Sequence, residues 1–468
     1  MLSRSERLVA VTRFGLGPSD ADLAEAASDP RGYVLAQVDP STPTPAALRD
    51  LKPLSVLRDE HLALRAELDE ARKAKRAARN GRGDAETAEE AALREEARKA
   101  MQRHARETFQ AEAAARVRVG LETETPFVER LVSFWQNHFA ISPTGVQGRL
   151  VTGNYEREAI RPFVFGRFED MAKAAILHPA MLHYLDNVQS VGPNSRQGRR
   201  RDGDINENLA REALELHTLG AGGGYGQDDV RSLALVLTGW QGGLVGNAER
   251  ALDFLPARHE PGPKTVLGKR YRDDGAAQAL AVIGDLARHP STARHVTGKL
   301  ARHFTSDRPP AGLAERLEAT FLDTDGDLLE VTQALVTADG AWTAPPAKFV
   351  PPSDFIVSAM RAFSVGLDMR AFNAGIRVLG FRLWEPKAPT GWPDADDAWL
   401  GGDHLLERLD WATLFARRDA TPPDDPVGFA ADLLGPDFDP DLEVAIGRAE
   451  STEQALALLL MSAQWQRR

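Results

Sequence analysis

Apolar residues recur at helical spacing along most of this chain, and that periodicity limits its fold more than any other feature. The clearest stripe lies in residues 126–141, where large apolar side chains mostly stand three or four positions apart: Phe127, Leu131, Phe134, Trp135 and Phe139. Comparable patterns recur in residues 154–161, 167–177, 179–186, 204–219, 227–238, 275–288, 290–304, 312–321, 327–337, 352–363, 368–379, 403–416 and 452–463. The sequence therefore predicts a mainly α fold with a multi-helix globular body.

Stretches in which apolar and polar residues alternate, as half-buried strands require, are few. The best candidate is a hairpin whose strands are residues 252–255 and 264–271. A segment rich in proline and glycine, residues 256–263, would join the two strands. We therefore expect at most a small β-hairpin beside the helices.

The chain contains no cysteine in its 468 residues. A disulfide framework, a thiolate zinc site, an iron–sulfur cluster and a cysteine nucleophile are therefore excluded, and any bound metal must use nitrogen and oxygen ligands. The 57 Lys and Arg residues against 68 Asp and Glu residues give a net charge of −11. This acidity argues against a general nucleic-acid-binding protein, which must neutralise phosphates over a broad surface.

Residues 54–124 differ in composition from the rest of the chain, because alanine and charged residues dominate them. Such a composition has high helix propensity but little material for a core. A turn at residues 80–84, Asn-Gly-Arg-Gly-Asp, divides the segment, so we expect a long antiparallel helical-hairpin arm with a basic tip. The arm is either a solvated hairpin or a binding element for a partner or an anionic surface. The predicted parts are then an N-terminal helical segment that packs on the body (1–53), the arm (54–124) and a helical main body (125–468).

The N-terminus carries Arg4 and Arg7, but the apolar stretch that follows, residues 8–11, is shorter than the roughly 7–15 apolar residues of a secretory signal. No run of about 18 apolar residues occurs in the chain, so we expect no transmembrane segment. These observations predict a soluble protein located in the cytoplasm.

The densest polar stretch is residues 204–220, which begin with N-cap residues and end with Gly220, so we expect one continuous helix. At about 100° per residue, Asn208, Glu212 and Glu215 share one face of that helix. Apolar residues surround the same direction, so Glu212 should point at least partly into the protein. A carboxylate in such a place costs several kcal/mol unless it is paired, protonated or bound to metal.

Two interpretations of this central helix remain open. In the first, Arg211 lies four residues from both Glu207 and Glu215 and forms an internal ion-pair ladder with them. In the second, Glu212 and Glu215 bind a divalent cation or act as an acid and base pair, because neighbouring carboxylates acquire separated pKa values. His217 falls on the opposite face, where we expect it to pack against another helix.

Three further groups of residues are candidates for function. Asn137 and His138 lie on the apolar helix 126–141. His138 is either a core histidine with its hydrogen bonds satisfied or a catalytic residue. His259 lies in an irregular segment, which suits a metal ligand or a proton-transfer residue. The third group lies in a proline-rich connection and either binds a sugar or fills a groove between helices: Trp384, Trp392 and Trp399.

Several motifs, in order along the chain, resemble the bacterial domain of unknown function 1800 family. They are residues 13–17 (RFGLG), 134–139 (FWQNHF), 206–212 (NENLARE), 215–220 (ELHTLG), 223–225 (GGY), 229–230 (DV), 237–240 (LTGW), 259 (H), 264–265 (KT), 289–290 (HP) and 391–393 (GWP). The resemblance covers nearly the whole chain but implies no activity, substrate or catalytic residue. Members are often exported and often encoded beside a sulfatase-like family. The resemblance therefore implies a sulfatase-like partner and a periplasmic or exported location, in contrast to the cytoplasmic prediction.

The leading functional hypothesis is a hydrolase-like or metal-assisted enzyme that uses a buried Glu, Asn and His cluster on the central helix. The candidate catalytic residues are Asn137, His138, Asn208, Arg211, Glu212 and Glu215. The candidate metal ligands, which would hold a divalent cation through oxygen and nitrogen, are Glu212, Glu215 and His259. The alternatives are a non-catalytic scaffold or accessory partner of a sulfatase-like protein and a carbohydrate-binding protein.

Overall fold

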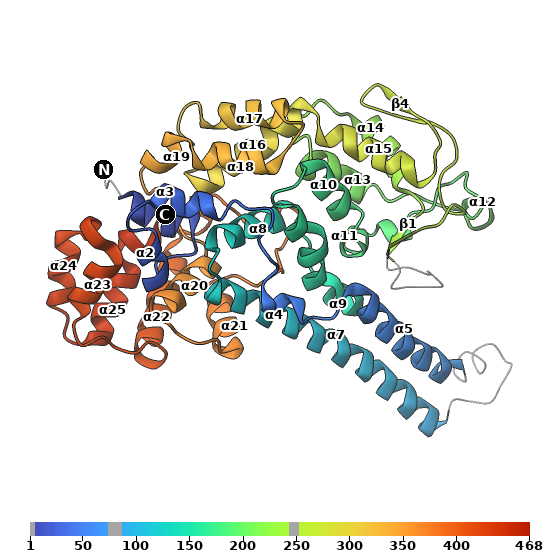
Figure 1. Cartoon of the computed structure of the whole chain (residues 1–468). Coiled ribbons are helices and arrows are strands. Elements are labelled where there is room, and N and C mark those ends of the chain that lie inside the picture. The colour runs from blue at the N-terminus through green and yellow to red at the C-terminus, as the bar shows by residue number, and fades with distance from the viewer. Residues whose placement is uncertain (1–4, 74–86, 243–251) are drawn as a thin grey trace.

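Helices make up most of the computed structural model, which describes residues 5–73, 87–242 and 252–468 (Figure 1). The α-helices of the first half are α1 (Glu6–Val9), α2 (Asp20–Glu25), α3 (Pro30–Ala36), α4 (Ala46–Arg49), α5 (Leu54–Ala71), α7 (Ala88–Glu122), α8 (Pro126–His138), α9 (Gly145–Tyr155), α10 (Phe168–Ile176), α11 (Pro179–Tyr184), α12 (Gly198–Arg201), α13 (Asn208–Glu212) and α14 (Gln227–Leu237). Those of the second half are α15 (Ala276–Ala287), α16 (Pro290–Phe304), α17 (Leu313–Asp323), α18 (Leu328–Val336), α19 (Asp339–Thr343), α20 (Pro352–Ala362), α21 (Met369–Val378), α22 (Gly402–Arg418), α23 (Pro426–Leu434), α24 (Pro440–Gly447), α25 (Thr452–Met461) and α26 (Ala463–Gln466). Short π-helical or 3₁₀ segments are η1 (Ala10–Phe14), η2 (Glu156–Ile160), η3 (Arg161–Phe163), η4 (Asn187–Gln189), η5 (Ala213–His217), η6 (Asp396–Ala398) and η7 (Gly435–Asp437). The predicted mainly α fold is confirmed.

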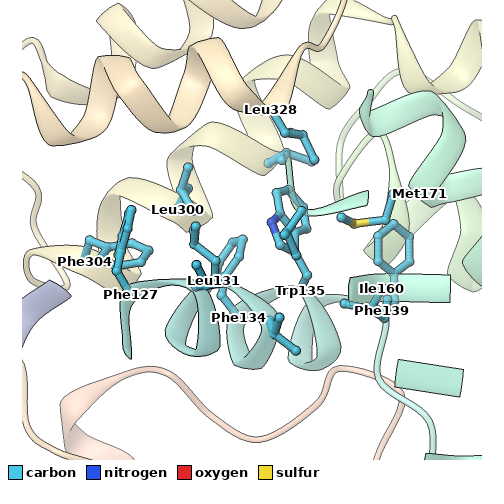
Figure 2. Packing of buried hydrophobic residues seen from close by; sticks show 14 of the residues in the cluster. Phe127, Leu131, Phe134, Trp135, Phe139, Ile160, Met171, Leu300, Phe304 and Leu328 are labelled. Atoms are coloured by element: carbon cyan, nitrogen blue, oxygen red, sulfur yellow. The ribbon is translucent and has the colours of Figure 1, made fainter. Parts of the chain in front are cut away.

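Helix α8 lies within the main hydrophobic core, and its apolar side chains point toward α16 and the neighbouring helices (Figure 2). Phe127 packs edge-on against Phe304 of α16, with ring centroids 5.7 Å apart. Trp135 packs against Phe168 of α10, also at 5.7 Å. Full burial of one such side chain contributes about 1.5–3 kcal/mol, so the apolar stripe of residues 126–141 is the reason that α8 occupies the core.

Helices α5 and α7 lie side by side and extend from the body as an arm (Figure 1). Thr87 and Glu90 form a capping box that starts α7. Nearer the body, α7 buries Ala113 and Val117 and contacts α9 and α20. The predicted helical-hairpin arm is confirmed, and most of its predicted basic tip belongs to residues 74–86, outside the described residues. No described helix, the 35-residue α7 included, is long and apolar enough to cross a membrane.

Two separate antiparallel sheets of two strands accompany the helices: β1 (Trp240–Gly242) with β2 (Leu252–Phe254), and β3 (Lys264–Val266) with β4 (Lys269–Tyr271). The predicted pairing of residues 252–255 with 264–271 is therefore wrong, although both segments contain strands. The reason is local, because Leu267 and Gly268 have φ values of 50° and 74° and form a tight turn inside the second segment. Positive φ at both central residues is typical of the two-residue turn that best matches strand twist.

The central segment 204–220 is not one continuous α-helix, which corrects the sequence prediction. Helix α13 passes directly into the π-helix η5, where the hydroxyl of Thr218 donates to the Ala213 carbonyl at 2.6 Å. A π-helix has hydrogen bonds between residues five apart and more residues per turn than an α-helix. The angle of about 100° per residue, from which the faces of this segment were predicted, therefore does not apply beyond Glu212. Gly220 follows with a φ of 82°, as the predicted helix end requires.

Candidate active site

A cavity of about 170 Å³ lies where α7, α8, α20 and the connection 379–394 meet. Most of its wall is apolar, and Phe381 stacks on Trp392 there with ring centroids 4.4 Å apart. Polar side chains from α8 and α16 interrupt the apolar wall: Gln136, Asn137 and His303. A concave apolar site with a few polar groups is typical of small-molecule binding.

His303 and Asp394 form a hydrogen-bonded pair in the wall of this cavity. Nδ1 of His303 lies 2.9 Å from Oδ1 of Asp394, and Nζ of the buried Lys348 lies 2.9 Å from Oδ2. Burial raises the pKa of Asp394, but the charges and hydrogen bonds of His303 and Lys348 outweigh it and hold that pKa at about 2. In the tautomer that carries its proton on Nδ1, His303 donates that proton to the carboxylate, and Nε2 is then a hydrogen-bond acceptor. A carboxylate that orients an imidazole in this way is the arrangement of a general base.

Three residues of the cavity wall have a buried polar side-chain atom without a hydrogen-bond partner in the described part of the chain: Nε2 of His303, Oε1 of Gln136 and Nε1 of Trp392. Each such atom costs about 1–3 kcal/mol when it stays unpaired, which is why folded proteins pair most of them. Oε1 and Nε2 are acceptors, and the indole N–H is a donor. All three of these side chains also line the cavity.

Asn137 holds the connection that carries Trp392 and Asp394 against α8. Its Nδ2 donates to the Trp392 carbonyl at 2.9 Å, and its Oδ1 accepts from the Trp392 N–H at 2.7 Å. Gly391 has a φ of 79°, and a Cβ atom there would lie 2.5 Å from the Asn137 carbonyl oxygen. The predicted candidate Asn137 therefore lies in the cavity wall, where it positions the connection.

Four charged side chains form a buried network beside the cavity. Arg116 contacts Glu129 at 3.2 Å and Glu156 at 3.1 Å. Arg161 contacts Glu129 at 2.6 Å and Glu156 at 3.0 Å. Burial raises the pKa of Glu129, but the charges of Arg161 and Arg116 outweigh it and leave that pKa below its ordinary value. The two arginines thus neutralise the two glutamates. Arg116 and Glu156 also line the cavity.

His138 is not part of the cavity wall and belongs to a separate buried polar group. Its Nε2 donates to the His217 carbonyl at 3.1 Å, and its Nδ1 lies 3.1 Å from Nζ of Lys299. Burial lowers the pKa of His138 well below its ordinary value and that of Lys299 to about 8. His217 packs on Phe139 at the end of α8, with ring centroids 5.2 Å apart, as expected for packing against another helix. His138 therefore has the contacts of a satisfied core histidine.

The candidate residues of the central helix lie outside the cavity wall. Asn208 is exposed, whereas Glu212 and Glu215 are partly buried. Burial and the neighbouring Glu215 raise the pKa of Glu212. Arg211 pairs with Glu207 at 3.3 Å, which forms the first half of the predicted ion-pair ladder.

The predicted metal ligands do not come together as one group. His259 instead bonds within its own region, with Nδ1 2.9 Å from the Thr238 carbonyl oxygen and Nε2 3.4 Å from Nζ of Lys264. Among residues 5–73, 87–242 and 252–468, no group of three or more His, Asp and Glu side chains is placed to hold a metal ion.

The three tryptophans of the proline-rich connection are mostly covered. Trp384 and Trp399 are 6% and 5% exposed, and Trp392 is partly buried against Phe381. These residues fill space between helices and form no open platform for a sugar ring, and two of them, Trp384 and Trp392, line the cavity. The geometry therefore favours the groove-filling interpretation over the carbohydrate-binding one.

His303 and Asp394 escaped prediction from the sequence, because 91 positions separate them and only the tertiary structure pairs them. A sequence signal for His303 nevertheless exists. His295, Lys299 and His303 stand at four-residue intervals, so these three polar residues share one face of α16. Asp394 directly follows the Gly-Trp-Pro motif at residues 391–393.

A comparison with protein-family models matches residues 9–467, nearly the whole chain, to the family described as Protein of unknown function (DUF1800). Comparisons with curated proteins and with solved structures find no match. The matched range includes every residue of the cavity wall. The function must therefore be inferred from the side chains themselves.

Proposed function

We propose that this chain, which belongs to the DUF1800 family of proteins of unknown function, is a hydrolase whose active site is the cavity between α7, α8 and α20. One observation carries the proposal. The His303–Asp394 pair lies in the cavity wall, and Nε2 of His303 has no hydrogen-bond partner among the residues that the structure describes.

His303 acts in this proposal as a general base on a water molecule. Its Nε2 takes a proton as the water oxygen attacks an electrophilic carbonyl carbon, and Asp394 stabilises the resulting imidazolium. The buried Lys348 keeps Asp394 ionised and in position. The imidazolium then returns the proton to the leaving group. A positioned base of this kind contributes about 10²–10⁴-fold to the rate.

The surroundings support this chemistry. A mostly apolar wall strengthens the electrostatic interactions inside the cavity. Asn137 and Gly391 fix the connection on which Asp394 lies, so the pair is held by rigid neighbours.

Glu212 and Glu215 provide a second proposal for acid and base chemistry on the central helix. The raised pKa of Glu212 favours its protonated form, which a general acid needs. These carboxylates lie outside the cavity wall, so the two proposals predict different sensitive residues. A third proposal, a non-catalytic accessory role beside a sulfatase-like partner, predicts no hydrolysis.

The test uses two uncharged aromatic substrates, p-nitrophenyl acetate and p-nitroacetanilide. We expect His303→Gln to lower kcat/KM by about 100-fold or more, because the general base is lost. Glu212→Gln and the control His404→Gln should retain wild-type rates. His404 is a matched control because it lies on α22, outside the cavity wall.

Other outcomes identify the competing proposals. A folded His303→Gln protein with wild-type rates would refute the proposed base, and a selective loss in Glu212→Gln would move the site to the central helix. Wild-type protein that hydrolyses neither substrate would favour the accessory role. Circular dichroism of each variant checks that it is folded.

A further inference from the structure

Helix α22 carries more exposed apolar side chains than any other helix in the described part of the chain. Leu406, Leu409 and Leu414 are 62%, 43% and 49% exposed, whereas each of the other described helices exposes at most one large apolar side chain. Figure 1 shows α22 within the group of C-terminal helices, on the side of the body away from the arm. Single apolar residues are ordinary on a protein surface, but several on one helix indicate a surface that a partner covers.

Two of these leucines belong to a stripe that is symmetric about Asp410. At about 100° per residue, four other exposed residues of α22 lie within about 40° of the direction of Asp410: Asp403, Leu406, Leu414 and Arg417. They stand seven and four positions before Asp410 and four and seven positions after it. These five residues are called the α22 stripe. It has an acid at one end, an arginine at the other and a leucine on each side of its centre.

The charged ends of the α22 stripe form no ion pair with another residue in the described part of the chain. Asp403 in the first turn and Arg417 in the last turn both suit the helix dipole. The dipole gives no reason for the leucines between them, which leave apolar surface in water. A helix that brings a base to Asp403, an acid to Arg417 and leucines to the positions between them would complement the whole stripe.

Helix α22 of a second molecule meets this description. We infer that two copies of this chain associate through an antiparallel pairing of their α22 stripes, with a two-fold axis at Asp410. The symmetric spacing then places Asp403 opposite Arg417 of the second copy, and Leu406 opposite Leu414 of the second copy. Each contact occurs twice, as in any two-fold interface. The opposite charges at the two ends fix the register and the antiparallel direction.

Leu409 extends the apolar surface beside the α22 stripe. Together with Leu458 and Met461 of α25, it lines a groove of about 600 Å³ between the two helices. The flexible side chain of methionine adapts to the shape of an entering group. A pair of 17-residue helices is nevertheless a small interface compared with the roughly 1,200–2,000 Å² of stable complexes. We therefore expect weak association that depends on protein concentration.

Asp410 is the unfavourable residue of this arrangement, because the two-fold axis brings its two copies together. Like charges at the centre of the interface repel each other and limit the affinity. Asp410→Asn should therefore lower the dissociation constant of the dimer by about threefold or more. A variant that dimerises more weakly than wild type would contradict the position of the axis.

Sedimentation velocity measures the association of the full-length protein in low salt, where exposed charges are least screened. We expect a monomer–dimer equilibrium with a Kd of about 10 μM, near the weak end for specific interfaces. Leu406→Ala should raise this Kd by about tenfold or more, because it removes two contacts of the dimer. The matched control is Leu322→Ala on α17, which should leave Kd unchanged because Leu322 is also exposed but lies outside the α22 stripe. Wild-type protein that remains monomeric up to about 200 μM would overturn the inference.

Charge reversal tests the predicted pairing directly. Asp403→Arg and Arg417→Asp should each raise Kd by about tenfold or more, because each puts like charges at both ends of the paired helices. An equal mixture of the two variants should associate about as tightly as wild type, since both ends of the mixed dimer again join opposite charges. Glu315→Arg, in the first turn of α17, is the matched control and should leave Kd unchanged.

The charge-reversal results also identify association through a different surface. A dimer that survives both single reversals, or variants that stay monomeric when mixed, would show that the two copies do not meet through the α22 stripe and would overturn the inference. Circular dichroism of each variant checks that it is folded.

Discussion

Asp394 illustrates how a single side chain in this protein takes its role from distant partners. It lies in an irregular connection, yet His303 and Lys348 both contact its carboxylate. Lys348 is 1% exposed, and its ammonium also contacts Asp307 at 2.8 Å. Removal of the Asp394 carboxylate therefore leaves the buried ammonium of Lys348 with Asp307 as its remaining anionic partner. It also removes the hydrogen bond that orients the His303 imidazole.

The low pKa of Asp394 predicts a specific effect on stability in acid. Its folded value of about 2 lies below the unfolded value of about 3.9, so the ionised group stabilises the native state above about pH 4. This contribution disappears as the pH falls from about 4 to 2. The side chain is 35% exposed, so solvent screening reduces the contribution to about 1 kcal/mol.

Asp394→Asn should accordingly be less stable than wild type at pH 7 and should lose less further stability between pH 4 and pH 2. Urea denaturation at several pH values measures both effects, with the exposed Asp397→Asn as the control. A variant whose stability falls in acid as steeply as that of wild type would contradict the assignment.

Helix α8 combines two kinds of contact that together position the cavity wall. One face packs in the apolar core, whereas Glu129 joins α8 to Arg116 of α7 and to Arg161 of η3. Glu156, at the start of η2, contacts the same two arginines. The network therefore connects α7, α8 and the segments η2 and η3 that follow α9.

Glu129→Gln should destabilise the protein by about 3–5 kcal/mol, because it leaves two buried guanidinium groups with insufficient negative charge. The matched control is Glu95→Gln, which breaks an exposed ion pair with Arg98 on the arm and should change stability little. Urea denaturation measures both variants. Equal effects of the two substitutions would show that the buried network contributes no more than a surface pair.

The cavity belongs to the molecule as a whole. Its wall takes Leu16 from the N-terminal segment, Arg116 from the base of the arm and Asp394 from the C-terminal part. Helix α7 thus contributes to the arm at one end and to the cavity at the other, which explains why α7 is the longer helix of the hairpin. The outer half of the arm is a separate matter, because its described residues are mostly exposed.

Replacement of residues 70–93 by a four-residue turn should therefore change the free energy of unfolding by less than about 1 kcal/mol. The rate of p-nitrophenyl acetate hydrolysis should stay at the wild-type value, because the cavity wall contains none of these residues. Urea denaturation and the hydrolysis assay measure the two quantities. A shortened protein that unfolds, or that loses hydrolysis shown by the wild type, would show that the outer arm supports the body.

Short motifs in the sequence carried the family resemblance. Local spacing determined the mainly α class, the core stripe of α8 and the helical-hairpin arm, because these features follow from contacts between residues three or four positions apart, which the order of residues displays directly. The pairing of β1 with β2, the π-helical turn η5 and the His303–Asp394 pair depended on the tertiary structure. A cavity forms where separately packed surfaces leave space and unpaired polar atoms, and that property has no counterpart in local periodicity. The sequence therefore indicated a helical protein with polar side chains in its core, and only the packing of α7, α8, α16 and α20 decided which of them face one site.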